Sequence, residues 1–456
     1  MTKEERNALL YKPQNGLDRI SAVEEAEMND YCEQYKAFLD VSKTERECVV
    51  SAIRLAEAKG FKPYTPGMDI APGDKLYYNN RGKAIMLMII GQKPLSEGAN
   101  IGAAHTDSPR LDLKPNPLYE DAELAYLKTH HYGGIRKYQW VTVPLELHGL
   151  VVRRDGSEVY VKIGDDPKDP QLVINDLLPH LGREQGKKPL NEAIPSETLN
   201  ILVGSRPLRD DDGSDRVKVE VLRLLNEKYG ITEEDFISAE LEAVPAANAR
   251  DIGLDRSLIG AYGHDDRVCA YAELAAILQL EAPEKTAVCI FADKEEVGSV
   301  GATGMNTRML ENFASQTLSR LDGCSEPVLR QALERSEFIS ADVIAGFDSN
   351  YPSAFEPDNS ARLGHGPVLI KYTGQNGKKG SNAASAEFLA ALRDTFDDAD
   401  VCWQLGEMGK IDLGGGGTIA YICALYGMEV IDSGVPVLSM HAPYETVAKL
   451  DCYMTY

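Results

Sequence analysis

Residues 285–304 have the sequence KTAVCIFADKEEVGSVGATG, in which a short apolar run is followed by two acidic side chains. The run from Lys285 to Ala292 has the length and character of a buried strand. Open α/β sheets bind their ligands at the carboxyl ends of their strands. Glu295 and Glu296 therefore suggest one carboxylate that holds a metal ion and one that moves a proton. An acidic pair is also common in the first turn of a helix, so this pair alone does not distinguish a metal site from a helix start.

Length and composition predict a globular protein of two domains. The chain has 456 residues, more than the roughly 250–300 at which a single core stops growing. Its net charge of -23 argues against nucleic acid or an acidic membrane surface as a partner. The eight cysteines are scattered singly, as is typical of reduced thiols. Because no signal segment and no run of ~20 apolar residues is visible, we expect a soluble cytoplasmic protein.

Strand and helix patterns predict an α/β fold at both ends of the chain. Residues 22–59 have helical spacing, and residues 84–91 and 99–104 are apolar runs of strand length. Later segments continue this pattern, with strands predicted at 338–347 and 435–441 and helices at 300–321, at 385–393 and after the glycines at 414–417.

The middle of the chain has a different pattern. Residues 140–152 and 158–163 read as β-strands joined by a hairpin-like turn at Arg154–Gly156. We therefore predict an α/β domain with an open mixed sheet, formed by residues 1–112 and 244–456, and an inserted, mostly β domain formed by residues 113–243.

Polar residues follow several of the predicted strands. His105 comes directly after the strand at 99–104, and Asp107 lies on the same face, where it could accept the other imidazole N–H. Asp265 and Asp266 precede a helix, and an N-cap role explains only one of them. Asp342 lies within an apolar run, where burial is costly unless the charge is paired.

A second histidine, His441, also ends an apolar strand. Two imidazoles and three carboxylates form the set of ligands that zinc prefers, with one carboxylate able to bridge two ions. The predicted ligands are His105, Asp265, Glu296, Asp342 and His441. The other histidines give weaker signals: His130 and His131 beside a glycine pair predict a surface loop, and for His180 the residues alone favour a structural role.

An ordered set of short motifs is similar to that of the M18 family of metalloaminopeptidases, the aspartyl-aminopeptidase-like group. The resemblance covers nearly the whole chain. Its motifs are HTDSP at 105–109, DDR at 265–267, EEVGS at 295–299, SAD at 340–342, GPVLIK at 366–371, the glycine run before Thr418 and SMH at 439–441. Each motif is short, but the set in this order is highly specific.

The resemblance implies an aminopeptidase with two divalent metal ions, Zn²⁺ with Mn²⁺ or Co²⁺ as alternatives. Asp265 would bridge the ions, with His105 and Asp342 on one and Glu296 and His441 on the other. Glu295 would be the general base and acid, and Asp107 would orient His105.

The resemblance also implies a role for the inserted domain. This domain would mediate dimerisation within a larger, dodecameric shell, and His180 would reach the active site of a neighbouring subunit. Relatives that select acidic N-terminal residues carry a histidine where this chain has Ala345. Lys371 is retained as a candidate substrate-binding residue, so acidic and neutral preferences both stay open.

Three other classes of protein fit the sequence less well than an aminopeptidase. A carboxypeptidase or deacylase of related fold must bind a carboxylate or acyl group, whereas the surplus of carboxylates here favours a free amine. Nucleotide binding is disfavoured because neither glycine run has the GxGxxG or GxxxxGKS pattern. A scaffold protein without catalysis would show gaps in the set of metal ligands, and the sequence shows none.

Overall fold

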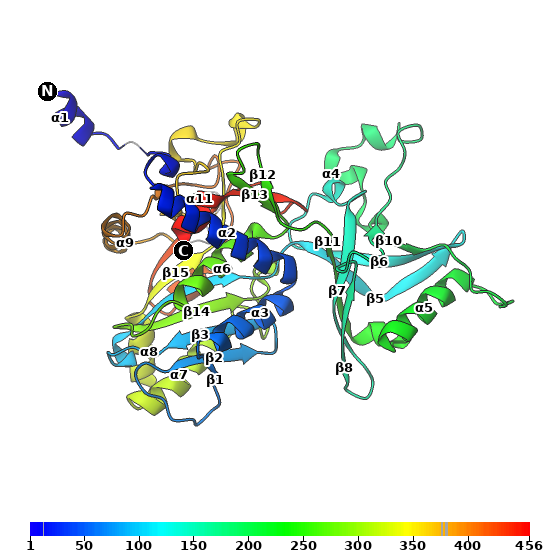
Figure 1. Cartoon of the computed structure of the whole chain (residues 1–456), viewed down its shortest axis with the longest axis horizontal. Coiled ribbons are helices and arrows are strands. Elements are labelled where there is room, and N and C mark those ends of the chain that lie inside the picture. The colour runs from blue at the N-terminus through cyan, green and yellow to red at the C-terminus, as the bar shows by residue number, and fades with distance from the viewer. Residues whose placement is uncertain (12, 375–376, 379–381) are drawn as a thin grey trace.

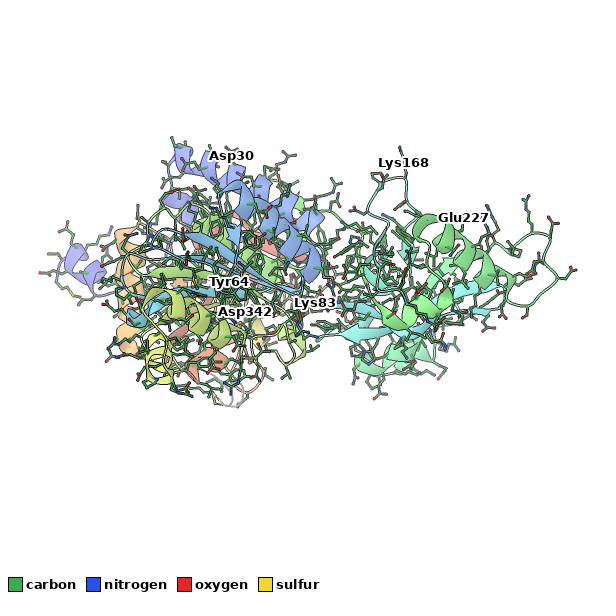
Figure 2. The ribbon with its side chains drawn as sticks, turned by 90° about the horizontal axis from the view of Figure 1, so that it is seen from below. Asp30, Tyr64, Lys83, Lys168, Glu227 and Asp342 are labelled. Carbon is green, nitrogen blue, oxygen red and sulfur yellow. The ribbon has the colours of Figure 1, made fainter. Side chains whose placement is uncertain are left out.

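The computed structural model describes residues 1–456 except 12, 375–376 and 379–381, and it has two lobes (Figure 1). The larger lobe contains both ends of the chain, and the smaller lobe contains the segment drawn in cyan to green. Figure 2 shows Asp342 within the larger lobe, Lys83 near the junction, and Lys168 and Glu227 on the smaller lobe.

A nine-stranded mixed sheet forms the centre of the larger lobe. In spatial order its strands are β1 (Lys62–Pro63), β2 (Lys75–Asn80), β3 (Ala84–Ile89), β14 (Thr286–Ala292), β4 (Ala99–His105), β15 (Glu337–Ala341), β19 (Glu429–Gly434), β17 (Val368–Ile370) and β18 (Gln404–Leu405). Strands β14, β4, β15 and β19 are mutually parallel, so their carboxyl ends meet at one edge of the sheet.

The alternation of side chains along the strands builds a core on each face of this sheet. In β3, Ile85, Leu87 and Ile89 face one core, while Met86 and Met88 face the other. Helices on the first face are α2 (Ala22–Val41), α3 (Glu45–Ala58), α6 (His264–Ile277) and α11 (Lys449–Thr455). Those on the second face are α7 (Met309–Leu321), α8 (Glu326–Glu334) and α10 (Ala420–Ala424). The predicted α/β fold is confirmed.

A second, five-stranded sheet in the larger lobe contributes to the site. Its strands are β12 (Arg250–Ile252), β13 (Leu258–Ala261), β21 (Glu445–Ala448), β20 (Pro436–Leu438) and β16 (Ile344–Ala345). Two further helices are α1 (Lys3–Ala8) and α9 (Ala386–Asp398), the latter packing Phe388 against Leu369 and Ile431. No helix in the described part of the chain is long and apolar enough to cross a membrane.

The smaller lobe is an antiparallel sheet of seven strands with two helices, α4 (Leu190–Ala193) and α5 (Arg216–Tyr229). Its strands are β5 (Arg110–Asp121), β6 (Leu124–Tyr132), β7 (Pro144–Val152), β8 (Glu158–Ile163), β9 (Leu172–Val173), β10 (Ile201–Gly204) and β11 (Ala239–Pro245). Because β11 pairs with both β5 and β7, the sheet closes on itself around a core that includes Trp140. The division into domains after residues 112 and 243 stays a prediction.

Several element boundaries differ from the sequence-based expectation. The helix expected from residue 300 begins at Met309, because Gly301 has a φ of +130° and the backbone turns back at Gly304. The helical segment expected at 22–59 consists of two helices separated at Ser42–Thr44, where the Thr44 side chain caps α3. His130 and His131 lie on β6 and not in a loop, because residues 124–132 pair with β5.

Buried ion pairs join the two lobes. Lys43, which precedes α3, lies 2.7 Å from Glu146 of β7, and both side chains are almost fully buried. His148 of β7 lies between Glu146 and Glu47, with its Nε2 3.1 Å from the first carboxylate and its Nδ1 2.9 Å from the second. Burial alone would raise the pKa of Glu47, but His148 and Lys162 outweigh it and lower this pKa to about 2. Charged groups therefore hold α3 against β7.

We expect Glu47→Gln to lower the free energy of unfolding at pH 7 by on the order of 3 kcal/mol. The pKa of Glu47 is lower in the folded than in the unfolded chain, so its contribution is complete above an unfolded pKa of about 4.5 and is lost as the pH falls toward 2. In urea unfolding, the difference from wild type should therefore narrow between pH 6 and pH 3. Glu158→Gln, at an exposed position on β8, is the control. A difference that does not change with pH would contradict this account.

Candidate metal centre

Three adjacent parallel strands deliver acidic and imidazole side chains to one edge of the central sheet. β4 ends on His105, and β15 is followed directly by Asp342. β14 is followed by a 3-10 turn that begins with Glu295 and Glu296. The sheet order β14–β4–β15 places these side chains next to one another, as the rule for carboxyl ends predicts.

The second sheet brings two more side chains to the same place. Asp265 lies in the first turn of α6, directly after β13, and the peptide bond that follows it is cis. His441 comes after β20 and has a φ of +66°. Glu445, at the start of β21, accepts hydrogen bonds from the backbone N–H groups of both residues, at 3.1 Å for Asp265 and 2.7 Å for His441.

Asp265 is the central member of the cluster because each of its two oxygens faces a different histidine. Its Oδ1 lies 3.1 Å from His105 Nε2, and its Oδ2 lies 3.2 Å from His441 Nε2. Asp342 Oδ1 lies 3.9 Å from His105 Nε2, and Glu296 Oε1 lies 3.3 Å from His441 Nε2. The five side chains thus form two groups, one around each histidine, that share Asp265.

The carboxylate oxygens of the cluster are arranged as metal ligands and not as partners in hydrogen bonds. Asp265 Oδ1 and Glu296 Oε1 are buried and, among the described residues, have no donor in hydrogen-bonding geometry. Buried carboxylate oxygens without a partner are rare in folded proteins. His105, Asp265 and Glu296 each present a ligand atom within 4.8 Å of the others, a spacing that allows side chains to surround metal ions.

The pKa shifts in the cluster reflect several buried acidic groups that lie close together. Burial raises the pKa of Glu296 and of Asp342 well above the usual range, and the neighbouring acids add to it. Burial alone would lower the pKa of His441, but Asp265 and Glu296 raise it to about 10. Divalent ions at this place would supply positive charge that favours the ionised form of these buried carboxyl groups.

Asp107 fixes the backbone around the cluster. The side chain is fully buried, and its two oxygens accept hydrogen bonds from the amides of Glu295 and Glu296, each at 3.2 Å. His105 Nδ1 lies 2.8 Å from the Asp107 carbonyl oxygen and 3.5 Å from its carboxylate. This contact holds the imidazole proton on Nδ1 and leaves Nε2 free toward Asp265.

Glu295 differs from its neighbours in its environment. The pKa of Glu295 is raised to about 7, mainly by burial, while His105 lowers it and Asp107 and Asp265 add to the rise. A carboxyl group with a pKa near 7 can both accept and donate a proton near neutral pH. Glu295 and Glu296 line the same cavity but come from successive positions of one turn, so they face it at different points.

A cavity of about 320 Å³ opens in front of the cluster. Much of its wall is apolar, formed by Val343, Ile344, Ile370, Met408, Ile411 and Met440. Besides the cluster, Lys378, Glu407 and Thr418 supply polar groups to the lining. Such a chamber can hold a small apolar side chain next to the candidate metal centre.

The remaining predicted site residues lie outside this lining. Lys371 follows Ile370 of β17 and sits close to the Tyr372 ring, beside the described cavity wall. His180 is exposed in a turn of the smaller lobe. Both assignments stay predictions. Sequence reasoning missed Glu445, Tyr132 and Gly134, which contact the cluster or its neighbours; the position of Glu445 four residues after His441 was the only local signal.

Two sheets whose strand ends bring together two imidazoles and three carboxylates are typical of the class of metal-dependent hydrolases. Comparison with known proteins gives the family. The model of the aminopeptidase I zinc metalloproteases (M18) matches residues 38–456. The chain belongs to this family, and it is therefore a zinc aminopeptidase, a hydrolase of the exopeptidase type.

Individual relatives agree with this assignment. A protein of Clostridium acetobutylicum named a probable M18 family aminopeptidase 1 is 49% identical over 98% of this chain and 97% of its own length. The crystal structure of an M18 aminopeptidase from Thermotoga maritima has a TM-score of 0.93 and 43% identity, with 98% of each chain covered. The dodecamer structure of mApe1 from S. cerevisiae shares the fold, with a TM-score of 0.74 at 20% identity over 93% of this chain and 94% of that one.

Proposed function

We propose that the protein removes N-terminal residues from peptides at a dinuclear metal centre. The observation that carries this proposal is the position of Asp265, whose two oxygens face His105 and His441 at 3.1 and 3.2 Å. His105 and Asp342 would complete one site, and Glu296 and His441 the other. Two zinc ions, with Mn²⁺ or Co²⁺ as alternatives, would polarise the scissile carbonyl and make water acidic enough to react near neutral pH.

Glu295 is the proposed general base and acid. It lines the cavity beside the ligands without being needed in either group, so its carboxylate is free to take a proton from the attacking water. The same carboxyl can then pass that proton to the departing amine. Asp107 holds the Glu295 amide and the His105 imidazole, which fixes the base relative to the ligands.

We propose that the surplus of carboxylates in the site binds the free α-amine of the substrate. Much of the cavity wall is apolar, and Ala345 stands where acid-selective relatives carry a histidine. These features support a neutral N-terminal residue over an acidic one. Lys371 stays a candidate for contacting the substrate backbone or an acidic side chain.

Self-association is the proposed role of the smaller lobe. A relative of the same fold forms a dodecamer, and four large apolar side chains around and beyond His180 are exposed, between 45% and 68%, in this chain: Leu177, Leu178, Leu181 and Leu190. We infer that this face binds a second copy of the chain and that His180 thereby approaches a neighbouring active site.

A substrate panel tests the proposed function. We expect hydrolysis of aminoacyl anilides with neutral side chains and none of N-acylated anilides, because the carboxylates require a free amine. Chelation of metal should lower kcat by at least ~10²-fold, and added Zn²⁺, Mn²⁺ or Co²⁺ should restore it. Preferential cleavage of N-acylated substrates would favour the related-fold alternative, a deacylase, and release of C-terminal residues would favour a carboxypeptidase.

A further inference from the structure

The end of β6, a strand of the smaller lobe, contacts the surroundings of both histidines. The Tyr132 hydroxyl donates a hydrogen bond of 2.8 Å to Asp107 Oδ2, and Asp107 in turn holds His105. Two residues later, the Gly134 carbonyl oxygen lies 2.9 Å from His441 Nδ1. One short segment therefore reaches both groups of candidate ligands, although it lies outside the lobe that supplies them.

The glycines allow this segment to approach so closely. Gly133 has a φ of +73°, and a Cβ there would lie 3.1 Å from Glu296 Oε2. A Cβ on Gly134 would lie 3.2 Å from His441 Nδ1. Both distances are tighter than ordinary side-chain contacts, so the backbone itself packs against Glu296 and His441.

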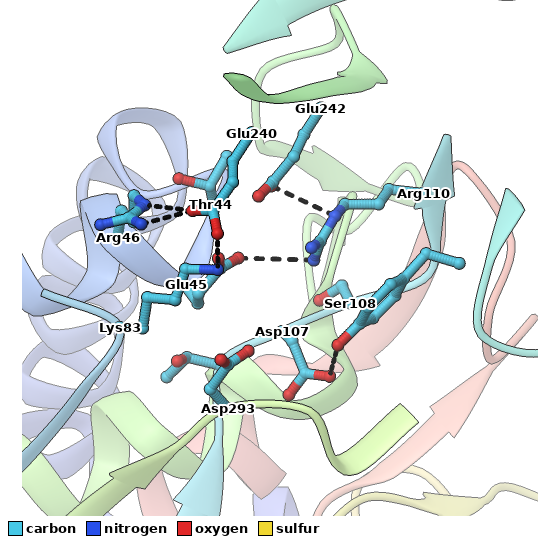
Figure 3. Close-up of polar contacts among 12 residues, drawn as sticks. Thr44, Glu45, Arg46, Lys83, Asp107, Ser108, Arg110, Glu240, Glu242 and Asp293 are labelled. Carbon is cyan, nitrogen blue, oxygen red and sulfur yellow. Dashed lines mark hydrogen bonds and ion pairs between the residues drawn. The ribbon is translucent and has the colours of Figure 1, made fainter. Parts of the chain in front are cut away.

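Arg110 holds the Tyr132 ring in place. Its guanidinium lies over the ring, 3.9 Å from the ring centre. Three carboxylates hold the guanidinium: Asp112 at 2.8 Å, Glu242 at 3.3 Å and Glu45 at 3.4 Å. Figure 3 shows Arg110 pointing toward Glu242 and Glu45, the latter from α3 of the larger lobe. The ring is thus fixed from both lobes.

We propose that Tyr132–Gly134 is a positioning segment for both ligating histidines. The Tyr132 hydroxyl keeps the Asp107 carboxylate turned toward His105 and the amides of Glu295 and Glu296. The Gly134 carbonyl accepts the Nδ1 proton of His441 and so leaves Nε2 free to ligate. The proposal rests on the proposed function for the identity of the ligands. Under this proposal, the smaller lobe positions candidate metal ligands in addition to its proposed role in self-association.

Tyr132→Phe tests the His105 side, since it removes only the hydroxyl. We expect metal retention against a chelator to fall by about 10–100-fold, as for other groups that orient metal ligands. kcat should fall with it while KM changes little, because Tyr132 does not line the cavity. The control is Tyr126→Phe on the same strand, whose ring stacks on Tyr119. Unchanged chelator resistance and unchanged kcat in Tyr132→Phe would overturn the proposal.

Gly134→Ala tests the His441 side. The added methyl group must displace the His441 ring, so we expect the absorption spectrum of the Co²⁺-loaded protein to change and the second equivalent of metal to bind more weakly. Gly186→Ala, where an added Cβ meets nothing within 4 Å, is the matched control. A Co²⁺ spectrum and a metal affinity equal to those of wild type in Gly134→Ala would contradict the proposal. If Tyr132→Phe does not fold, these two measurements on Gly134→Ala decide the proposal alone. Wild type that binds no metal would refute the proposed function instead.

Discussion

Glu295→Gln is expected to lower kcat by at least ~10²-fold while both metal ions stay bound. The amide keeps the size of the side chain but cannot take a proton from water or return it to the leaving amine. Because Glu295 belongs to neither group of ligands, metal content measured by mass spectrometry should equal that of wild type. KM should change little, since the cavity keeps its shape.

Glu284→Gln is the matched control for this variant. Glu284 lies just before β14 on the same segment but is exposed, where it pairs with Lys93 at the surface. Its kcat should equal that of wild type. Turnover in Glu295→Gln within a few-fold of wild type would reject Glu295 as the base, and loss of metal from it would show that Glu295 is a ligand.

Asp265→Asn is expected to remove both metal ions and, with them, all measurable activity. The substitution keeps the shape of the side chain but removes the charge of the one carboxylate that faces both histidines. Metal per chain should fall from two to near zero. Asp342→Asn and Glu296→Gln each touch one histidine, so each should lose one ion preferentially.

The exposed Asp121→Asn, at the end of β5, controls for the loss of a negative charge. A stoichiometry of one ion per chain in wild type, or two ions retained in Asp265→Asn, would contradict the bridging role. Thermal unfolding of each variant with and without added Zn²⁺ shows whether the loss reflects binding or folding, since a ligand that binds only the folded chain raises Tm.

Part of the site could be predicted from local pattern alone. His105 directly follows one apolar run and the Glu295–Glu296 pair lies shortly after another, and the rule for strand ends places them together once the strands are known to be parallel. Asp265 and His441 come from a second sheet, and nothing in the spacing of the residues fixes how that sheet docks on the first. Local pattern made both residues candidates, but only the resemblance in motif order assigned each of them to a metal ion.

The contacts from the smaller lobe could not be predicted. Tyr132 and Gly134 reach the site because the register of β6 against β5 sets Tyr132 opposite Arg110, and register is a long-range property. The neighbouring His130 and His131 were predicted to lie in a loop because the glycine pair after them is typical of one. The late start of α7 has a similar origin, since glycine-rich turns and helix starts share a local pattern.

The site draws on residues from almost the full length of the polypeptide. His105 precedes the smaller lobe, whereas His441 and the Glu445 that holds it follow every strand of the central sheet. During translation, the second of the two proposed imidazole ligands is therefore absent until residue 441 has been made. The proposed metal centre can be completed only when the chain is nearly finished, which would prevent peptide hydrolysis during translation.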